Sequence, residues 1–167
     1  MLGAPGAYAA WVEWLDAFGR GEDRPADHLR PVDAGMGPQM LDRLLGHVQR
    51  VFRERQHRWN DVLLRDLRAL NAQSTSAIEV MLTSARTRLA PLRAFADHPG
   101  FPEDLRALLR DGLAETVRSA QSSLEDSTRR APFEVQSAVR RNKMTVPLAP
   151  PPTSPAPAPA PGRRVIL

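Results

Sequence analysis

The chain has 167 residues, a formal net charge of +4 and no cysteine. This length suits one domain with appendages, and the absence of cysteine excludes disulfides, thiolate metal sites and a cysteine nucleophile. These features fit a cytoplasmic protein. We expect no N-terminal targeting signal, and no apolar run approaches the roughly 20 residues that a membrane span needs.

Charge is distributed unevenly along the chain. Residues 1–35 hold six acidic residues against three arginines, a net charge of −3. Residues 36–128 are close to neutral, and residues 129–167 hold seven basic residues against one glutamate, a net charge of +6. The isoelectric point of about 10.8 does not by itself indicate a nucleic-acid partner, because a GC-rich genome encodes many arginines and Lys143 is the only lysine.

Residues 1–37 predict a short amphipathic helix followed by a flexible Pro/Gly linker. Large apolar residues recur at helical spacing up to a stop at Gly19. They are Tyr8, Trp11, Val12, Leu15 and Phe18. Because Glu13 and Asp16 would be repelled by an anionic bilayer, we expect this helix to dock on the protein's own bundle, with partner binding as the alternative.

Residues 38–142 predict a helical bundle. An apolar stripe with 3–4 spacing runs from Leu41 to Leu70, and a helix over 38–70 would be about 50 Å long, a length that implies a bundle or coiled coil. A second helix is expected over 75–96, with a capping box of Ser76 and Glu79 and a kink at Pro91. The sequence leaves open whether these two helices are continuous.

Residues 97–102 form the clearest turn, and another apolar stripe follows it as far as Leu124. Such a short connection makes the two flanking helices antiparallel neighbours. Pro132 ends this helix, and 133–141 can add one or two turns. We therefore predict an all-α fold of three to five helices built around a long antiparallel hairpin. A homodimer that completes the core stays open.

Residues 143–167 predict a disordered Pro/Ala tail, because eight prolines fall between 147 and 161. The tail ends in two arginines and three large aliphatic residues. We predict that this tip binds a protein partner, by strand addition in a groove that also holds the terminal carboxylate. A solvated basic terminus is the alternative. The predicted partner-binding residues are Arg163, Arg164, Val165, Ile166 and Leu167.

The sequence offers no constellation for catalysis. Glu54 and His57 match half of the carboxylate–histidine set of di-iron bundles, but no second pair exists. A flexible loop carrying Asp23, Asp27 and His28 is a poor metal cage, and neither a Gly-rich phosphate loop nor a Gly-x-Ser-x-Gly elbow is present. We predict no catalytic, cofactor or metal site, and therefore a non-enzymatic protein.

The layout of a helical body, a Pro/Ala spacer and a short end peptide resembles that of cargo proteins that dock into bacterial shells or compartments. The amphipathic hairpin with an Ala/Pro tail also resembles storage-granule-coating proteins. Both resemblances lie in the layout and assign no residue. Our leading hypothesis is an adaptor or cargo-type interaction protein. The alternatives are a surface-coating protein and a nucleic-acid-binding protein that uses Arg50, Arg53 and Arg58 on one helix.

Overall fold

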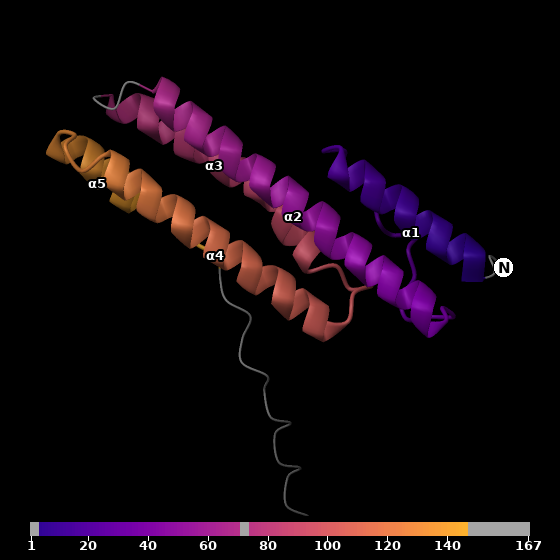
Figure 1. Cartoon of the computed structure of the whole chain (residues 1–167). Helices are drawn as coiled ribbons and strands as arrows, with labels where there is room; N and C mark the ends of the chain where they lie inside the picture. Colours follow the sequence, from indigo (N-terminus) through magenta and orange to yellow (C-terminus); the bar gives the residue numbers. More distant parts are fainter. Residues whose placement is uncertain (1–3, 71–73, 147–167) are drawn as a thin grey trace, which may run out of the picture.

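A computed structural model describes residues 4–70 and 74–146 of the chain. Within these two ranges the protein is built from helices alone, which confirms the all-α prediction (Figure 1). The elements in chain order are α1 (Ala4–Gly19), α2 (Pro38–Ala69), α3 (Thr75–Ala96), α4 (Glu103–Ser127) and α5 (Phe133–Arg141). The predicted spacer and the tip Arg163–Leu167 lie outside the described residues.

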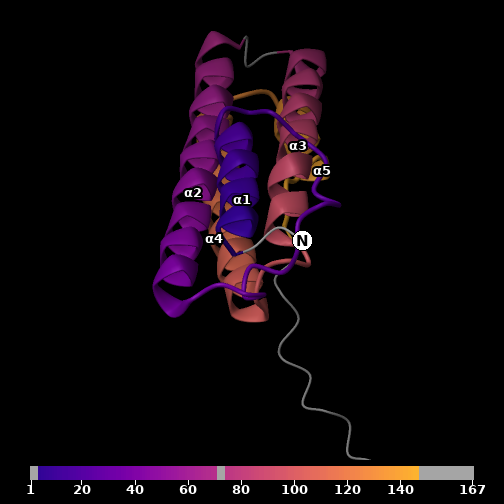
Figure 2. The ribbon, with the colours of Figure 1, turned by 90° about the vertical axis from the view of Figure 1, so that its right-hand side faces the viewer.

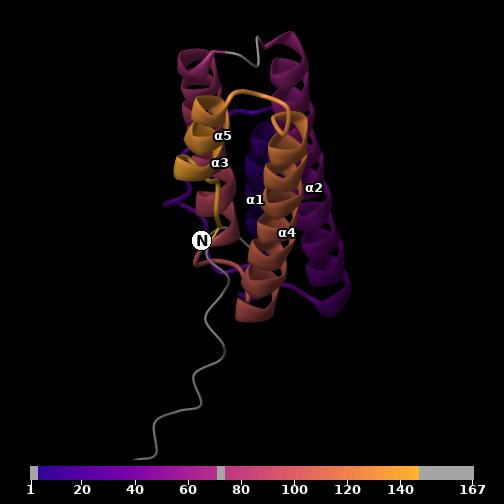
Figure 3. The ribbon, with the colours of Figure 1, turned by 90° about the vertical axis from the view of Figure 1, so that its left-hand side faces the viewer.

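The three long helices α2, α3 and α4 run up, down and up beside one another, so the predicted antiparallel pair α3–α4 is present (Figures 2 and 3). Helix α1 covers one face of the α2–α3 pair and α4 covers the opposite face. The short α5 packs on α3 and α4. Both outer faces of the central pair are thus covered within one chain, which removes our sequence-based reason for a homodimer.

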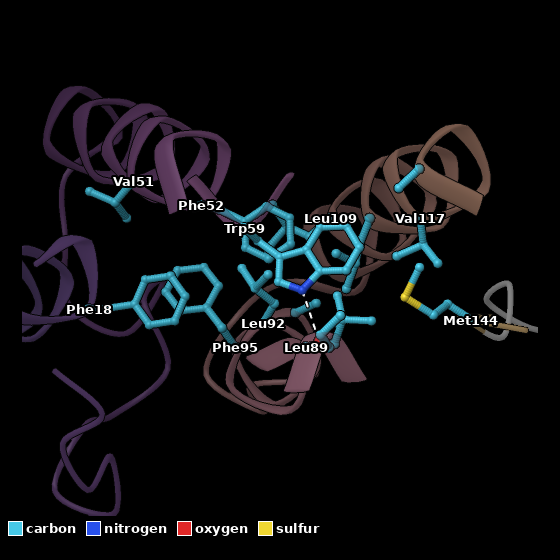
Figure 4. Close-up of a cluster of buried hydrophobic side chains, with 14 of the residues drawn as sticks. Phe18, Val51, Phe52, Trp59, Leu89, Leu92, Phe95, Leu109, Val117 and Met144 are labelled. Atoms are coloured by element: carbon cyan, nitrogen blue, oxygen red, sulfur yellow. Dashed lines mark hydrogen bonds between the residues drawn. The ribbon is translucent and has the colours of Figure 1, made fainter. Parts of the chain in front are cut away.

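The core combines an aliphatic stripe with one aromatic cluster. Buried residues on α2, α3 and α4 recur at helical spacing and meet along the bundle axis. Near the α3–α4 turn, rings from four parts of the chain pack together, and Figure 4 shows Phe18, Phe52 and Phe95 among them. The aromatic cluster comprises Trp11, Trp14 and Phe18 of α1, Phe52 of α2, Phe95 of α3 and Phe101 of the turn.

The junction between α2 and α3 differs from the expected capping box. The N-cap of α3 is Ser74, whose Oγ accepts a hydrogen bond from the Ala77 N–H at 3.2 Å. Ser76 therefore falls inside the first turn, and the predicted Ser76–Glu79 box is wrong. The two helices are separate and antiparallel, and α3 runs without a break through Pro91.

The segment between α1 and α2 is packed, although its Pro/Gly content predicts a flexible linker. Val32 is fully buried, and its N–H donates to the Gly100 carbonyl at 2.9 Å. The indole N–H of Trp11 donates to the Arg30 carbonyl at 2.9 Å, and that of Trp14 donates to the Arg24 carbonyl at 3.1 Å. Residues 20–37 are therefore part of the folded body.

Replacing Trp59 should strongly lower the free energy of unfolding. This residue is 4% exposed and donates its indole N–H to the Ala85 carbonyl at 2.9 Å. Trp59→Phe removes this donor and leaves unfilled volume, so it should lower the free energy of unfolding by about 1–3 kcal/mol. Urea unfolding followed by circular dichroism measures the change. Phe133→Leu, at a ring that is 76% exposed, is the control and should stay within about 0.5 kcal/mol of wild type. Equal losses in both variants would contradict this packing.

Candidate functional site

The basic side chains that the sequence places on α2 contact different neighbouring elements. Arg55, which falls in the apolar stripe, lies over the Phe18 ring at 4.3 Å and pairs with Asp23 at 2.7 Å. Arg58 donates to the Gly19 carbonyl, and His47 Nε2 lies 2.8 Å from the Asp16 carboxylate. These side chains fasten α1 and its linker to α2.

Arg53 and His57 lie on another side of α2, where they line a groove of about 540 Å³ toward α4. Gln56 crosses this groove and donates to the Gly112 carbonyl at 2.9 Å and to the Thr116 hydroxyl. The three arginines of the nucleic-acid hypothesis therefore do not converge on one surface, because Arg58 contacts the end of α1, Arg50 contacts His47 and Arg53 lines the groove toward α4.

A second hollow lies between α1, the linker and α3, and we call it the α1–α3 pocket. Its volume of about 620 Å³ is in the range of ligand sites. Its walls are mostly apolar, with charged side chains contributed by residues 22–24. The lining residues are Trp14, Phe18, Glu22, Asp23, Arg24, Pro25, Ala26, Thr87, Ala90, Pro91, Ala94, Phe95 and His98.

Small residues on the outer side of α3 leave this hollow open. Ala90 and Ala94 present only methyl groups beside the aromatic cluster. Pro91 has no N–H, so the carbonyl of Thr87, four residues earlier, does not receive its intrahelical hydrogen bond. The α1–α3 pocket thus combines an apolar wall with a helix turn that lacks one backbone hydrogen bond.

The charged side of the pocket is held by ion pairs. Arg24 contacts Glu22 at 2.8 Å and Glu13 at 3.5 Å, and Asp23 contacts Arg55. The hydrogen bond and charge of Arg20 lower the pKa of Glu22, which keeps this carboxylate ionised. Arg20, Arg24 and Arg55 thus offset the carboxylates of Glu13, Glu22 and Asp23, so this side of the pocket is charged but close to neutral.

His98 lines the pocket and is only 7% exposed. Its ring lies edge-on to Trp11 and Trp14, at centroid distances of 5.1 and 5.2 Å. Nδ1 accepts the Gly100 N–H at 2.9 Å, so the neutral ring carries its proton on Nε2. Burial lowers the pKa of His98 and favours this neutral form.

The segment that follows α5 is fixed to α3 and α4. Arg86 donates to the Asn142 carbonyl at 3.0 Å, and Arg93 donates to the Thr145 carbonyl. The N–H of Met144 donates to the buried Gln121 side chain at 3.1 Å, and Met144 itself is 2% exposed. Residues 142–146, which we call the strap, therefore belong to the body.

No family model matches the chain, and no curated protein or solved structure is significantly similar to it. Among the described helices, none combines the length and apolarity needed to cross a membrane. Residues 4–70 and 74–146 hold no group of three or more histidines or carboxylates arranged to bind a metal ion.

The predicted site residues Arg163, Arg164, Val165, Ile166 and Leu167 lie outside the described residues, so their role stays a prediction. The α1–α3 pocket was not predicted from the sequence. Its one sequence signal is the set of small uncharged residues Thr87, Ala90 and Ala94 around Pro91, a proline inside a helix.

Arg55 should control how firmly α1 and the linker are held. Arg55→Met keeps the apolar stem but removes the ion pair to Asp23 and the cation over Phe18. We expect a loss of about 1–2 kcal/mol in the free energy of unfolding and faster tryptic cleavage after Arg20, which precedes Gly21. Arg118→Met, at an exposed intrahelical pair with Glu115, is the control. Wild-type cleavage rates in Arg55→Met would rule out this role.

His98 should make stability depend on pH. Unfolded histidine binds a proton below about pH 6.5, whereas burial lowers the pKa in the folded protein. The folded state therefore loses stability as the pH falls from about 7 through the lowered folded pKa. His98→Gln lacks this titration, so its free energy of unfolding should fall less between pH 7.5 and 5.5. Parallel urea-unfolding profiles for the two proteins would contradict the assignment.

Proposed function

We propose that this protein is a non-enzymatic adaptor, in which a closed helical body carries a C-terminal peptide that captures a protein partner. The observation that carries the proposal is the strap. Met144 is buried and three side chains, Arg86, Arg93 and Gln121, hold the backbone of residues 142–146. A tail that begins from a fixed point on a folded body suits a tether, because its reach is then set by the spacer alone.

The body itself offers little exposed apolar surface for other roles. Among the described residues, the large exposed hydrophobic side chains are Val80, Leu108 and Phe133, on three different helices. By contrast, Val165-Ile166-Leu167 places three large aliphatic residues together after a spacer of proline and alanine. Such a peptide can supply its backbone and alternate side chains to a groove or sheet edge of a partner.

The two alternative functions receive less support from the described contacts. A surface-coating protein would have to expose the buried apolar faces of its helices, at about 1.5–3 kcal/mol for each large side chain. A nucleic-acid-binding protein would need converging arginines, whereas Arg58 is engaged with α1 and Arg53 lines a different groove.

The tip should be necessary for partner capture. A variant with Val165, Ile166 and Leu167 changed to alanine should recover at least about tenfold less partner from a lysate of the native host than the intact chain, since hot-spot side chains carry most of the binding energy. Affinity purification with quantitative mass spectrometry measures the recovery, and circular dichroism checks that helicity is unchanged.

The spacer provides a matched control. Replacing residues 147–162 by a Gly/Ser segment of equal length keeps the tip and its distance range, so partner recovery should stay within about twofold of wild type if the spacer acts only through its length. Recovery of the same partners by the triple-alanine tip variant would refute the adaptor proposal.

A further inference from the structure

We propose that the α1–α3 pocket is a docking site for the protein's own Arg163–Leu167 segment, so that the body and the partner compete for the same peptide. The inference rests on the proposed function, in which this segment is the recognition peptide. Its other supports are the chemistry of the pocket, the point at which the chain leaves the strap, and the charge of the two segments.

The pocket suits a short aliphatic peptide. Its apolar wall is formed by three rings of the aromatic cluster and by the methyl groups of Ala90 and Ala94, which matches valine, isoleucine and leucine in polarity. The three rings are Trp14, Phe18 and Phe95. Thr87 and Pro91 both line the pocket, and because proline has no N–H, the Thr87 carbonyl lacks its usual helical donor and could accept a peptide N–H. A volume of about 620 Å³ accommodates a few side chains rather than a folded element.

The strap binds α3, the helix that also lines the pocket. Arg93 binds the Thr145 carbonyl and is the neighbour of Ala94 in the pocket wall. The strap and the pocket therefore flank one stretch of α3. The 18 residues between Val146 and Val165 span up to about 56 Å at 3.1 Å per residue, several times the roughly 10–12 Å diameter of a helix. Tethering over so short a path gives an effective concentration on the order of millimolar.

Charge favours the same pairing. Residues 1–35, which contain α1 and the linker, carry a net charge of −3, and the tip holds two basic residues, Arg163 and Arg164, with no acidic side chain. At the pocket, the carboxylates of Glu22 and Asp23 already pair with arginines, but their side chains are 47% and 51% exposed, so a further cation can approach them. Arg163 and Arg164 precede the aliphatic residues directly, so aliphatic side chains in the pocket would bring both guanidinium groups close to these carboxylates.

The test uses a labelled synthetic peptide of residues 160–167 and the full-length chain with Val165, Ile166 and Leu167 changed to alanine. This chain keeps its folded body, but its own tip cannot compete. Fluorescence anisotropy should show saturable binding of the peptide. Ala94→Arg in the same chain, a change at an exposed residue that fills and charges the pocket wall, should weaken binding at least about tenfold.

Ser84→Arg is the matched control, because it adds the same side chain at an exposed residue of α3 that does not line the pocket, and it should leave binding unchanged. The intact chain should bind the peptide more weakly than the triple-alanine chain, since its own tip occupies the pocket. Absence of saturable binding, or equal binding by Ala94→Arg, would overturn the docking site.

Two further outcomes separate this inference from the proposed function. If the intact and triple-alanine chains bind the peptide equally, or if the tip links two copies into a dimer in sedimentation, intramolecular docking is wrong. If docking is right, Ala94→Arg in the otherwise intact chain should recover more partner from lysate than wild type. The proposed function fails separately, when the triple-alanine variant still recovers the wild-type partners.

Discussion

The fold depends on the packing of Phe95 among the rings of α1. Phe95 stacks on Phe18 at a centroid distance of 4.1 Å and on Trp14 at 5.3 Å, and it also meets Phe52 of α2. The ring of Phe95 on α3 therefore contacts both α1 and α2 at one end of the bundle. Because protein interiors are close-packed, this contact fixes how α1 lies across the central pair, and the linker, the α3–α4 turn and the α1–α3 pocket all take their positions from it.

The α3–α4 turn packs so closely against α1 that one of its positions has no space for a side chain. A side chain at Gly100 would bring its Cβ to 2.9 Å from Trp11 Cζ2 and to 3.0 Å from the His98 ring. Only glycine leaves room for the indole there. The same residue donates its N–H to His98 and its carbonyl accepts from Val32, so a single position without a side chain connects α1, the linker and the turn.

Local sequence signals were enough to predict the helices, because apolar spacing, glycine and proline act over a few residues. Such signals predict the end of α1 at Gly19, the turn at 97–102 and the antiparallel pair of helices that this turn connects. The order of the linker could not be predicted in this way. Tryptophan side chains ten and nineteen residues away along the chain hold it, and no periodic pattern encodes contacts between an irregular segment and a distant helix. The division of the α2 arginines between α1 and α4 escaped prediction for the same reason.

The two indole N–H groups of α1 donate to main-chain carbonyls, of Arg30 and of Arg24, rather than to side chains. Every amino acid supplies such a carbonyl. The linker can therefore exchange its side chains at these positions and keep both hydrogen bonds, whereas Trp11 and Trp14 have no equivalent replacement. We would thus expect relatives of this chain to preserve the two indoles and the length of the linker while its residues drift, so that a search for the family should weigh the tryptophan spacing above the sequence that lies between α1 and α2.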